Sequence, residues 1–108
     1  MTLSEKHCVP CRKDMGALSP ADAETFLKAL TGWELIDAGK MLSKRWTFKN
    51  FAQALAFVNR IGEIAETENH HPDIAFGWGY VTIRLQTHRI GGLHENDFIL
   101  AAKIDKLQ

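Results

Sequence analysis

The chain has 108 residues, a length that suits one domain with a modest hydrophobic core. Hydrophobic residues make up 45% and charged residues 24%, as in ordinary soluble globular proteins. The 13 basic and 13 acidic residues cancel and form no basic stripe, so direct nucleic-acid binding is not expected. No apolar run is long enough to span a membrane, and the first residues lack the apolar segment of a signal peptide, so we expect a cytoplasmic protein with no membrane partner.

Residues 1–18 are expected to form a poorly ordered leader, and residues 19–108 a single domain. The leader carries Cys8 and Cys11 in a Cys-Val-Pro-Cys arrangement, which suits a redox pair or half of a zinc site. A redox motif of this spacing should follow a strand and open a helix, and a structural zinc site needs four ligands, of which only His7 is nearby. Because both contexts are missing, the sequence assigns no role to the two cysteines.

The first half of the domain is predicted to be a helix followed by a β-hairpin. Ser19 is a good N-cap and Pro20 suits the first helical position. The apolar face of this helix comprises Ala23, Phe26, Leu27 and Leu30. Residues 33–36 and 42–48 are rich in strand formers and flank a turn, which indicates a hairpin.

A second helix is expected from Asn50, as its N-cap, to about Glu68. Its predicted core stripe has five members widened by two more: Phe51, Leu55, Val58, Ile61 and Ala65, with Phe57 and Ile64. Residues 80–88 then form the clearest predicted strand, paired in a hairpin with residues 73–76. Alternate positions of this strand should face the core (Val81, Ile83 and Leu85), while His88 ends its polar face.

A last helix is predicted over residues 94–106, and it is apolar on more than one side. One face can cover the sheet, and the other is expected to contact another subunit through Leu100, Ile104 or Leu107. The resulting order is α-ββ-α-ββ-α. We therefore predict an α+β fold with a single antiparallel four-stranded sheet and its helices packed on one face.

The candidate site centres on the corner formed by His70, His71 and Pro72. A residue before proline favours extended backbone, so His71 should leave the helix line and point away from His70. Imidazole suits proton transfer near neutral pH, although two solvated surface histidines at a helix end are an alternative interpretation. The hairpin that follows can bring His88 back to this corner, with Trp78 as an aromatic wall.

Other chemistries are less well supported by the sequence. The three histidines lack metal-binding spacing on one helix or strand, so no metal site is predicted. No serine lies in a nucleophile elbow, and no glycine-rich phosphate loop precedes a helix. Acid–base chemistry by imidazole on a small substrate remains.

Seven spaced residues resemble the signature of the pterin-4a-carbinolamine dehydratases: Glu66, His70, His71, Pro72, Trp78, His88 and Asp97. The resemblance extends from about Ser19 to Leu107 and includes Trp33 and the Gly91-Gly92-Leu93 segment. His94 departs from it, because a Ser or Thr helix cap is expected at that place.

This resemblance implies a cofactor-free dehydratase that converts 4a-hydroxy-tetrahydropterin, released by aromatic amino acid hydroxylases, to quinonoid dihydropterin and water. It implies proton transfer by His70 and His88. His71 and Pro72 would hold the pterin. Further substrate contacts are implied for Thr87, Arg89 and Trp78, although Trp78 is equally suited to closing the core. For Asp97 a structural role at the start of the last helix is expected, and Glu66 is a signature position that can also be structural.

The resemblance also implies a homo-oligomer, a dimer or tetramer, formed through the last helix and the sheet edges. The rival hypothesis is a binding module, either an assembly factor or a dimerisation cofactor of a homeodomain transcription factor. The presence of all three histidines favours the enzyme, since a pure binding module does not need them.

Overall fold

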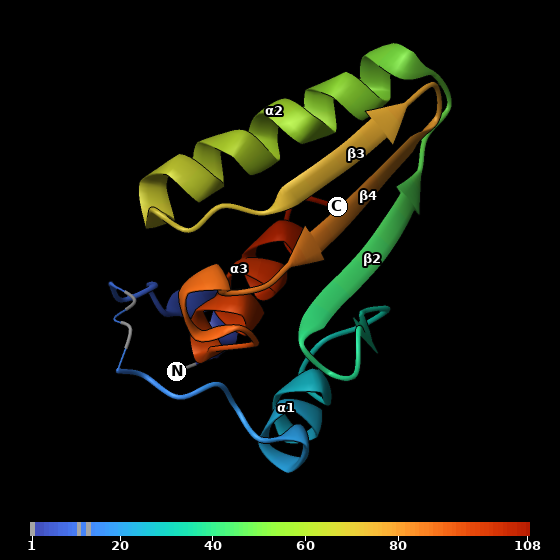
Figure 1. Ribbon diagram of the computed structural model, residues 1–108. Helices are drawn as coiled ribbons and strands as arrows, with labels where there is room; N and C mark the ends of the chain where they lie inside the picture. The colour runs from blue at the N-terminus through green and yellow to red at the C-terminus, as the bar shows by residue number, and fades with distance from the viewer. Residues whose placement is uncertain (1, 11, 13) are drawn as a thin grey trace.

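The computed structural model describes residues 2–10, 12 and 14–108. In this part of the chain the elements are η1 (Leu3–Glu5), α1 (Pro20–Leu27), β1 (Glu34–Ile36), β2 (Met41–Thr47), α2 (Phe51–Glu68), β3 (Asp73–Gly77), β4 (Tyr80–Leu85), η2 (His88–Ile90) and α3 (Glu95–Asp105). The strands form one antiparallel sheet in the order β1-β2-β4-β3 (Figure 1). The predicted α-ββ-α-ββ-α fold is confirmed.

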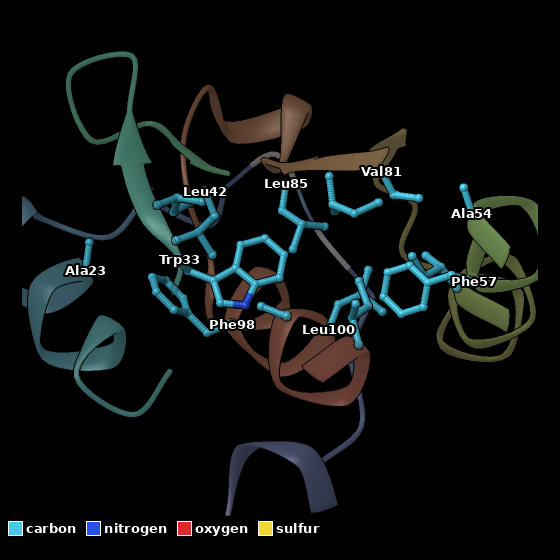
Figure 2. Packing of buried hydrophobic residues seen from close by; sticks show 14 residues of the cluster. Ala23, Trp33, Leu42, Ala54, Phe57, Val81, Leu85, Phe98 and Leu100 are labelled. Carbon is cyan, nitrogen blue, oxygen red and sulfur yellow. The ribbon is translucent and has the colours of Figure 1, made fainter. Parts of the chain in front are cut away.

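The helices cover one face of the sheet, and the core lies between the two layers. The central strands bury Leu42, Val81, Ile83 and Leu85 on this face. Figure 2 shows Trp33 in the middle of the core, between side chains of the sheet and Phe98 of α3. The small α1 joins the same core through Phe26, whose ring stacks on Phe98 at 5.2 Å between centroids.

The predicted helix starts are confirmed by their capping hydrogen bonds. The Ser19 hydroxyl accepts from the Asp22 N–H at 3.2 Å, and the Asn50 side chain accepts from the Gln53 N–H at 2.9 Å. The end of α2 was not predicted in this detail: Asn69 adopts a left-handed conformation with φ of 53°. Asparagine tolerates this conformation, which turns the chain sharply out of the helix toward His70.

The predicted core stripe of α2 is confirmed except at two residues near the start of the helix. Phe51 and Leu55 are 46% and 39% exposed. The predicted residues Phe57, Ile61 and Ala65 are buried, and Ala54, which was not predicted, joins them at helical spacing. The apolar surface of this helix is wider than the sheet below it, so part of the predicted stripe remains at the surface.

The predicted subunit contact of the last helix is also wrong for two of its three residues. Leu100 and Ile104 are fully buried within the chain, and Leu107 is partly buried. The side of α3 turned away from the sheet is covered by the N-terminal segment, where Leu3 packs against the core (Figure 1). The leader therefore covers one side of α3, which its polar composition did not indicate.

The described residues of the leader contact the domain at several points. The Lys103 ammonium donates to the Ser4 carbonyl at 3.0 Å, and the Leu18 N–H donates to the Leu93 carbonyl at 2.8 Å. The division of the chain at residue 18 stays a prediction, and Cys11 lies outside the described residues. No helix in the described part of the chain is long and apolar enough to cross a membrane.

Candidate active site

The site is built on a buried pair between the His-His-Pro corner and the start of α3. The Nε2 of His70 lies 2.6 Å from the Oδ1 of Asp97. The side chain of Asp97 is fully buried, and that of His70 is 12% exposed. A carboxylate only accepts hydrogen bonds, so the Nε2 of His70 carries the proton in this pair.

Two further donors fix the Asp97 carboxylate. Its Oδ2 accepts from the Thr87 hydroxyl at 2.8 Å and from the His94 N–H at 3.0 Å. Both oxygens are therefore occupied, and the carboxylate is held in one orientation toward His70. The structural role expected of Asp97 is present, because its bond to His94 is half of a capping box at the start of α3. The same side chain also positions a histidine, which the sequence reasoning missed.

The cap of α3 is made by His94 itself. Its Nδ1 accepts from the Asn96 N–H at 3.0 Å, in the place where a Ser or Thr hydroxyl was expected. The ring nitrogen thus replaces a hydroxyl oxygen as the cap acceptor. This explains how the departure from the expected residue preserves the helix start that carries Asp97.

The second histidine of the corner has a different partner from the first. The Nε2 of His71 contacts the Oε2 of Glu66 at 2.5 Å. Both side chains are more than half exposed, in contrast to the buried His70–Asp97 pair. The two adjacent histidines thus have separate partners, and Glu66 holds His71 from the last turn of α2. Pro72, half-buried, leads directly into β3.

The expectation that His88 ends a strand is wrong. β4 stops at Leu85, and His88 opens the short η2 helix. The strand stops because Thr87 pairs with Gly92 in an isolated bridge, and Gly91 takes a left-handed conformation that closes the loop. His88 and Arg89 are both exposed on this loop. The Nδ1 of His88 lies 3.3 Å from the side-chain nitrogen of Gln86.

The loop nevertheless carries His88 toward the buried pair. Its neighbour Thr87 is buried and bonded to Asp97, which in turn contacts His70. His70 and His88 are thereby linked through two intervening side chains. His71 lies beside His70 in the sequence, so the three predicted histidines share one end of the molecule.

Trp78 is not part of this site within the chain. It is 71% exposed in the turn between β3 and β4. The site lies at the other end of this hairpin, and five strand residues span about 13 Å at roughly 3.3 Å per residue. Two interpretations were made for Trp78: an aromatic wall of the site, and a side chain that closes the core. Its exposed position agrees with neither of them within the chain.

The described residues contain no group of three or more His, Cys, Asp or Glu side chains that could hold a metal ion. His70 and His71 each face one carboxylate, and these carboxylates belong to different elements. The expected absence of a metal stays a prediction for experiment.

Comparison with known proteins identifies the family. The sequence profile of the pterin 4 alpha carbinolamine dehydratases matches residues 16–107. A protein of Halorhodospira halophila is 50% identical over 107 residues, covering 99% of this chain and 98% of its own length. Its name assigns the pterin-4-alpha-carbinolamine dehydratase activity only provisionally. An Arabidopsis thaliana protein, mitochondrial pterin-4-alpha-carbinolamine dehydratase 2, is 47% identical over 110 residues, covering 98% of this chain and 59% of its own.

Two solved structures share the fold. A crystal structure from Brucella melitensis, described as a transcriptional coactivator/pterin dehydratase, has a TM-score of 0.80 and 28% identity, covering 85% of this chain and 98% of its own. A pterin dehydratase-like protein described as a RuBisCO assembly factor in the alpha-carboxysome has a TM-score of 0.61 and 32% identity, covering 70% and 88%. The chain belongs to the pterin-4-alpha-carbinolamine dehydratase family.

Proposed function

We propose that the protein dehydrates 4a-hydroxy-tetrahydropterin to quinonoid dihydropterin and water. The observation that carries the proposal is the buried Asp97 carboxylate, whose Oδ1 lies 2.6 Å from the Nε2 of His70. A carboxylate that orients an imidazole is the usual arrangement of a histidine acting in general acid–base catalysis. The capping box accounts for one oxygen of Asp97, and the other is aimed at His70, a contact that a helix cap does not require.

The reaction moves two protons and needs no electron transfer. The hydroxyl on C4a leaves as water after gaining a proton, and a ring N–H gives up a proton as the C=N bond of the quinonoid product forms. The C4a–O bond breaks with its electron pair on oxygen. One imidazole supplies the first proton and another accepts the second, so the residues of the chain suffice without a cofactor.

In this proposal His70 and His88 are the proton-transfer residues. His71, held by Glu66, binds the pterin together with Pro72, and the loop residues Thr87 and Arg89 contribute contacts beside His88. The bond between Thr87 and Asp97 ties this loop to His70. Recycling of the pterin cofactor of aromatic amino acid hydroxylases and a cytoplasmic location belong to the same proposal.

The direct test is a stopped-flow dehydration assay with synthetic 4a-hydroxy-tetrahydropterin. We expect the wild-type protein to accelerate dehydration above the buffer rate in proportion to enzyme concentration. The matched control is Lys40→Ala, because Lys40 is exposed in the turn between β1 and β2, outside the proposed site. A wild-type protein that fails to raise the rate, while folded, rules out the dehydratase.

Metal dependence is tested with the same assay. We expect dialysis against EDTA to leave the rate unchanged, because each of His70 and His71 contacts a single carboxylate on a separate element. Elemental analysis of the purified protein checks the result. One zinc or iron per chain, removed together with activity, contradicts acid–base catalysis by imidazole alone.

The second candidate is an assembly or binding function. The neighbour described as a RuBisCO assembly factor, and the exposed apolar residues Phe51, Leu55 and Trp78, favour it. The two functions differ in their sensitive residues: substitution of His70 should lower kcat for dehydration and leave partner binding intact. Substitution of Phe51 should do the reverse.

A further inference from the structure

The first residues of the chain cross the outside of the site. We call residues 2–9 the N-terminal strap. In Figure 1 this segment lies against α3 near the lower end of α2. The match to the family profile begins at residue 16, so the strap lies outside the segment that the profile matches. Besides the bonds of Lys6 to Glu95 and of Ser4 to Lys103, it is held by hydrogen bonds to two side chains, Glu68 and Asn96.

The first anchor is Glu68, the last residue of α2. Its Oε1 accepts from the Cys8 N–H at 2.7 Å, and its Oε2 contacts the Nδ1 of His7 at 2.9 Å. Glu68 is buried, and Lys103 of α3 lies 3.7 Å from the same Oε2. Glu68 lies two residues before His70, so the strap binds the end of α2 immediately before the His-His-Pro corner.

The second anchor is Asn96, on the first turn of α3. Its side-chain oxygen accepts from the Val9 N–H at 3.0 Å, and its nitrogen donates to the Val9 carbonyl at 2.7 Å. This two-way bond imitates a pair of strand hydrogen bonds. Asn96 is buried and directly precedes Asp97, the partner of His70.

The two anchors are close in sequence to the two partners of the His70–Asp97 hydrogen bond. His70 follows Glu68 on the α2 side, and Asp97 follows Asn96 on the α3 side. We infer that the strap is a positioning element of the active site, which holds the end of α2 and the start of α3 at the separation that the His70–Asp97 bond requires. The inference rests on the proposed function only where kcat is measured. The rate of Cys8 modification and the NMR signals of His70 test it without any activity.

The strap contains its own reporter, the Cys8 thiol. Its sulfur lies 3.6 Å from the Asn96 carbonyl. Burial, together with the charges of Glu68 and Asp97, raises the pKa of Cys8 to about 12. The docked thiol is therefore protonated and unreactive at neutral pH, and release of the strap should expose it.

The test uses Val9, whose side chain is 52% exposed and whose backbone bonds to Asn96. Val9→Pro removes the N–H that Asn96 accepts, and Val9→Ala keeps it as the matched control. A second pair acts at the other anchor: Glu68→Ala removes the acceptor of the Cys8 N–H, and Glu68→Gln keeps it. All variants are full-length and carry Cys11→Ser, so that Cys8 is the one thiol left to modify.

Three quantities are compared: the rate of Cys8 modification by a disulfide reagent, the NMR signals and pH titration of the His70 ring, and kcat. In Val9→Pro and Glu68→Ala we expect modification to accelerate about tenfold or more as the half-buried thiol leaves its contact with Asn96. We expect altered His70 signals and a kcat lowered about tenfold with little change in KM, the effect of a displaced catalytic group. Val9→Ala and Glu68→Gln should stay close to the parent.

Each other result overturns the inference. If Cys8 becomes reactive while the His70 signals and kcat stay unchanged, the strap has no positioning role. If neither Val9→Pro nor Glu68→Ala accelerates modification, these contacts do not hold the strap. If the parent protein lacks dehydratase activity, the proposed function fails, and the His70 titration still decides whether the strap positions the pair.

Discussion

At the scale of single residues, the roles proposed for the histidines rest on the partner that each of them contacts. His70 is held by a buried carboxylate, while His71 is held by an exposed one. A buried, oriented imidazole suits a transition-state role, because its geometry is set before the substrate arrives. An exposed histidine held at a helix end suits contact with a bound ligand. In the proposed mechanism His88, on the loop after Thr87, is the second proton-transfer residue.

The first prediction compares the three histidines under one buffer and pH. Substitution of His70 or His88 by alanine should lower kcat by about 10²–10⁴-fold, the usual contribution of general acid–base catalysis. Because uncatalysed dehydration of a carbinolamine is not very slow, we expect the lower part of this range. His71→Ala should raise KM and change kcat little, which indicates lost uniform binding. Wild-type kinetics in all three folded variants would remove the histidines from the mechanism and favour the binding module.

The second prediction separates the two tasks of Asp97. Asp97→Asn keeps the size of the side chain but removes the charge behind His70, so kcat should fall. Thr87→Val removes a single donor to the same carboxylate and should lower kcat less. Thr87→Val removes one of the two hydrogen bonds to the Asp97 Oδ2, and Asp97→Asn removes the buried charge that these bonds stabilise. Each change should cost about 1–3 kcal/mol in the free energy of unfolding. Urea unfolding and steady-state kinetics measure the two effects. A Thr87→Val variant as slow as Asp97→Asn contradicts this ranking.

At the scale of elements, the helix ends determine where the site can form. The left-handed Asn69 ends α2 at the corner, and the capping box of His94 and Asp97 begins α3 facing it. The corner itself was predictable, because a capped amphipathic helix followed by His-His-Pro is a local pattern. The contact of Asp97 with His70 was not, since it joins residues 27 positions apart in the sequence.

The errors at this scale have the same cause. The end of β4 depends on the bridge between Thr87 and Gly92, and residues of the loop continue the alternating pattern past the real end of the strand. Leu100 and Ile104 suggested a subunit contact because nothing in the polar leader indicated that it would cover α3. Local periodicity gives the faces of an element, and tertiary contacts decide which face is covered.

The third prediction concerns the strap and pH. Burial by itself would raise the pKa of Glu68, but hydrogen bonds from Cys8 and His7 and the charge of Lys103 lower it overall from 4.5. A carboxyl whose folded-state pKa is lowered stabilises the fold above its unfolded pKa, and this contribution is lost as pH falls through the lowered value. Wild-type stability should therefore drop more than that of Glu68→Gln as pH falls from 7 to below about 4.5. Urea unfolding at several pH values provides the comparison, and parallel curves for the two proteins contradict it.

At the scale of the whole molecule, two kinds of surface remain without a partner in the described chain. The outer strands β1 and β3 are the edges of the sheet, and α2 carries an exposed apolar face around Leu55. Free sheet edges and apolar helix faces are the surfaces through which small domains associate. The predicted homo-oligomer therefore keeps a structural basis, although the face of α3 that first suggested it is covered.

The last prediction tests this association. Light scattering should give a mass at least twice that of the 12.2 kDa chain. Leu55→Glu places a charge on the exposed apolar face of α2 and should lower the mass, since an unpaired charge in an apolar contact is strongly unfavourable. Ala56→Glu is the control, because it adds the same charge to the same helix about a quarter turn away, at an exposed position. A stable monomer for the wild type refutes the oligomer. If the oligomer of Leu55→Glu has the same mass as that of the wild type, the sheet edges remain as the contact. Faster amide hydrogen exchange in β1 or β3 on dilution then identifies the strand involved.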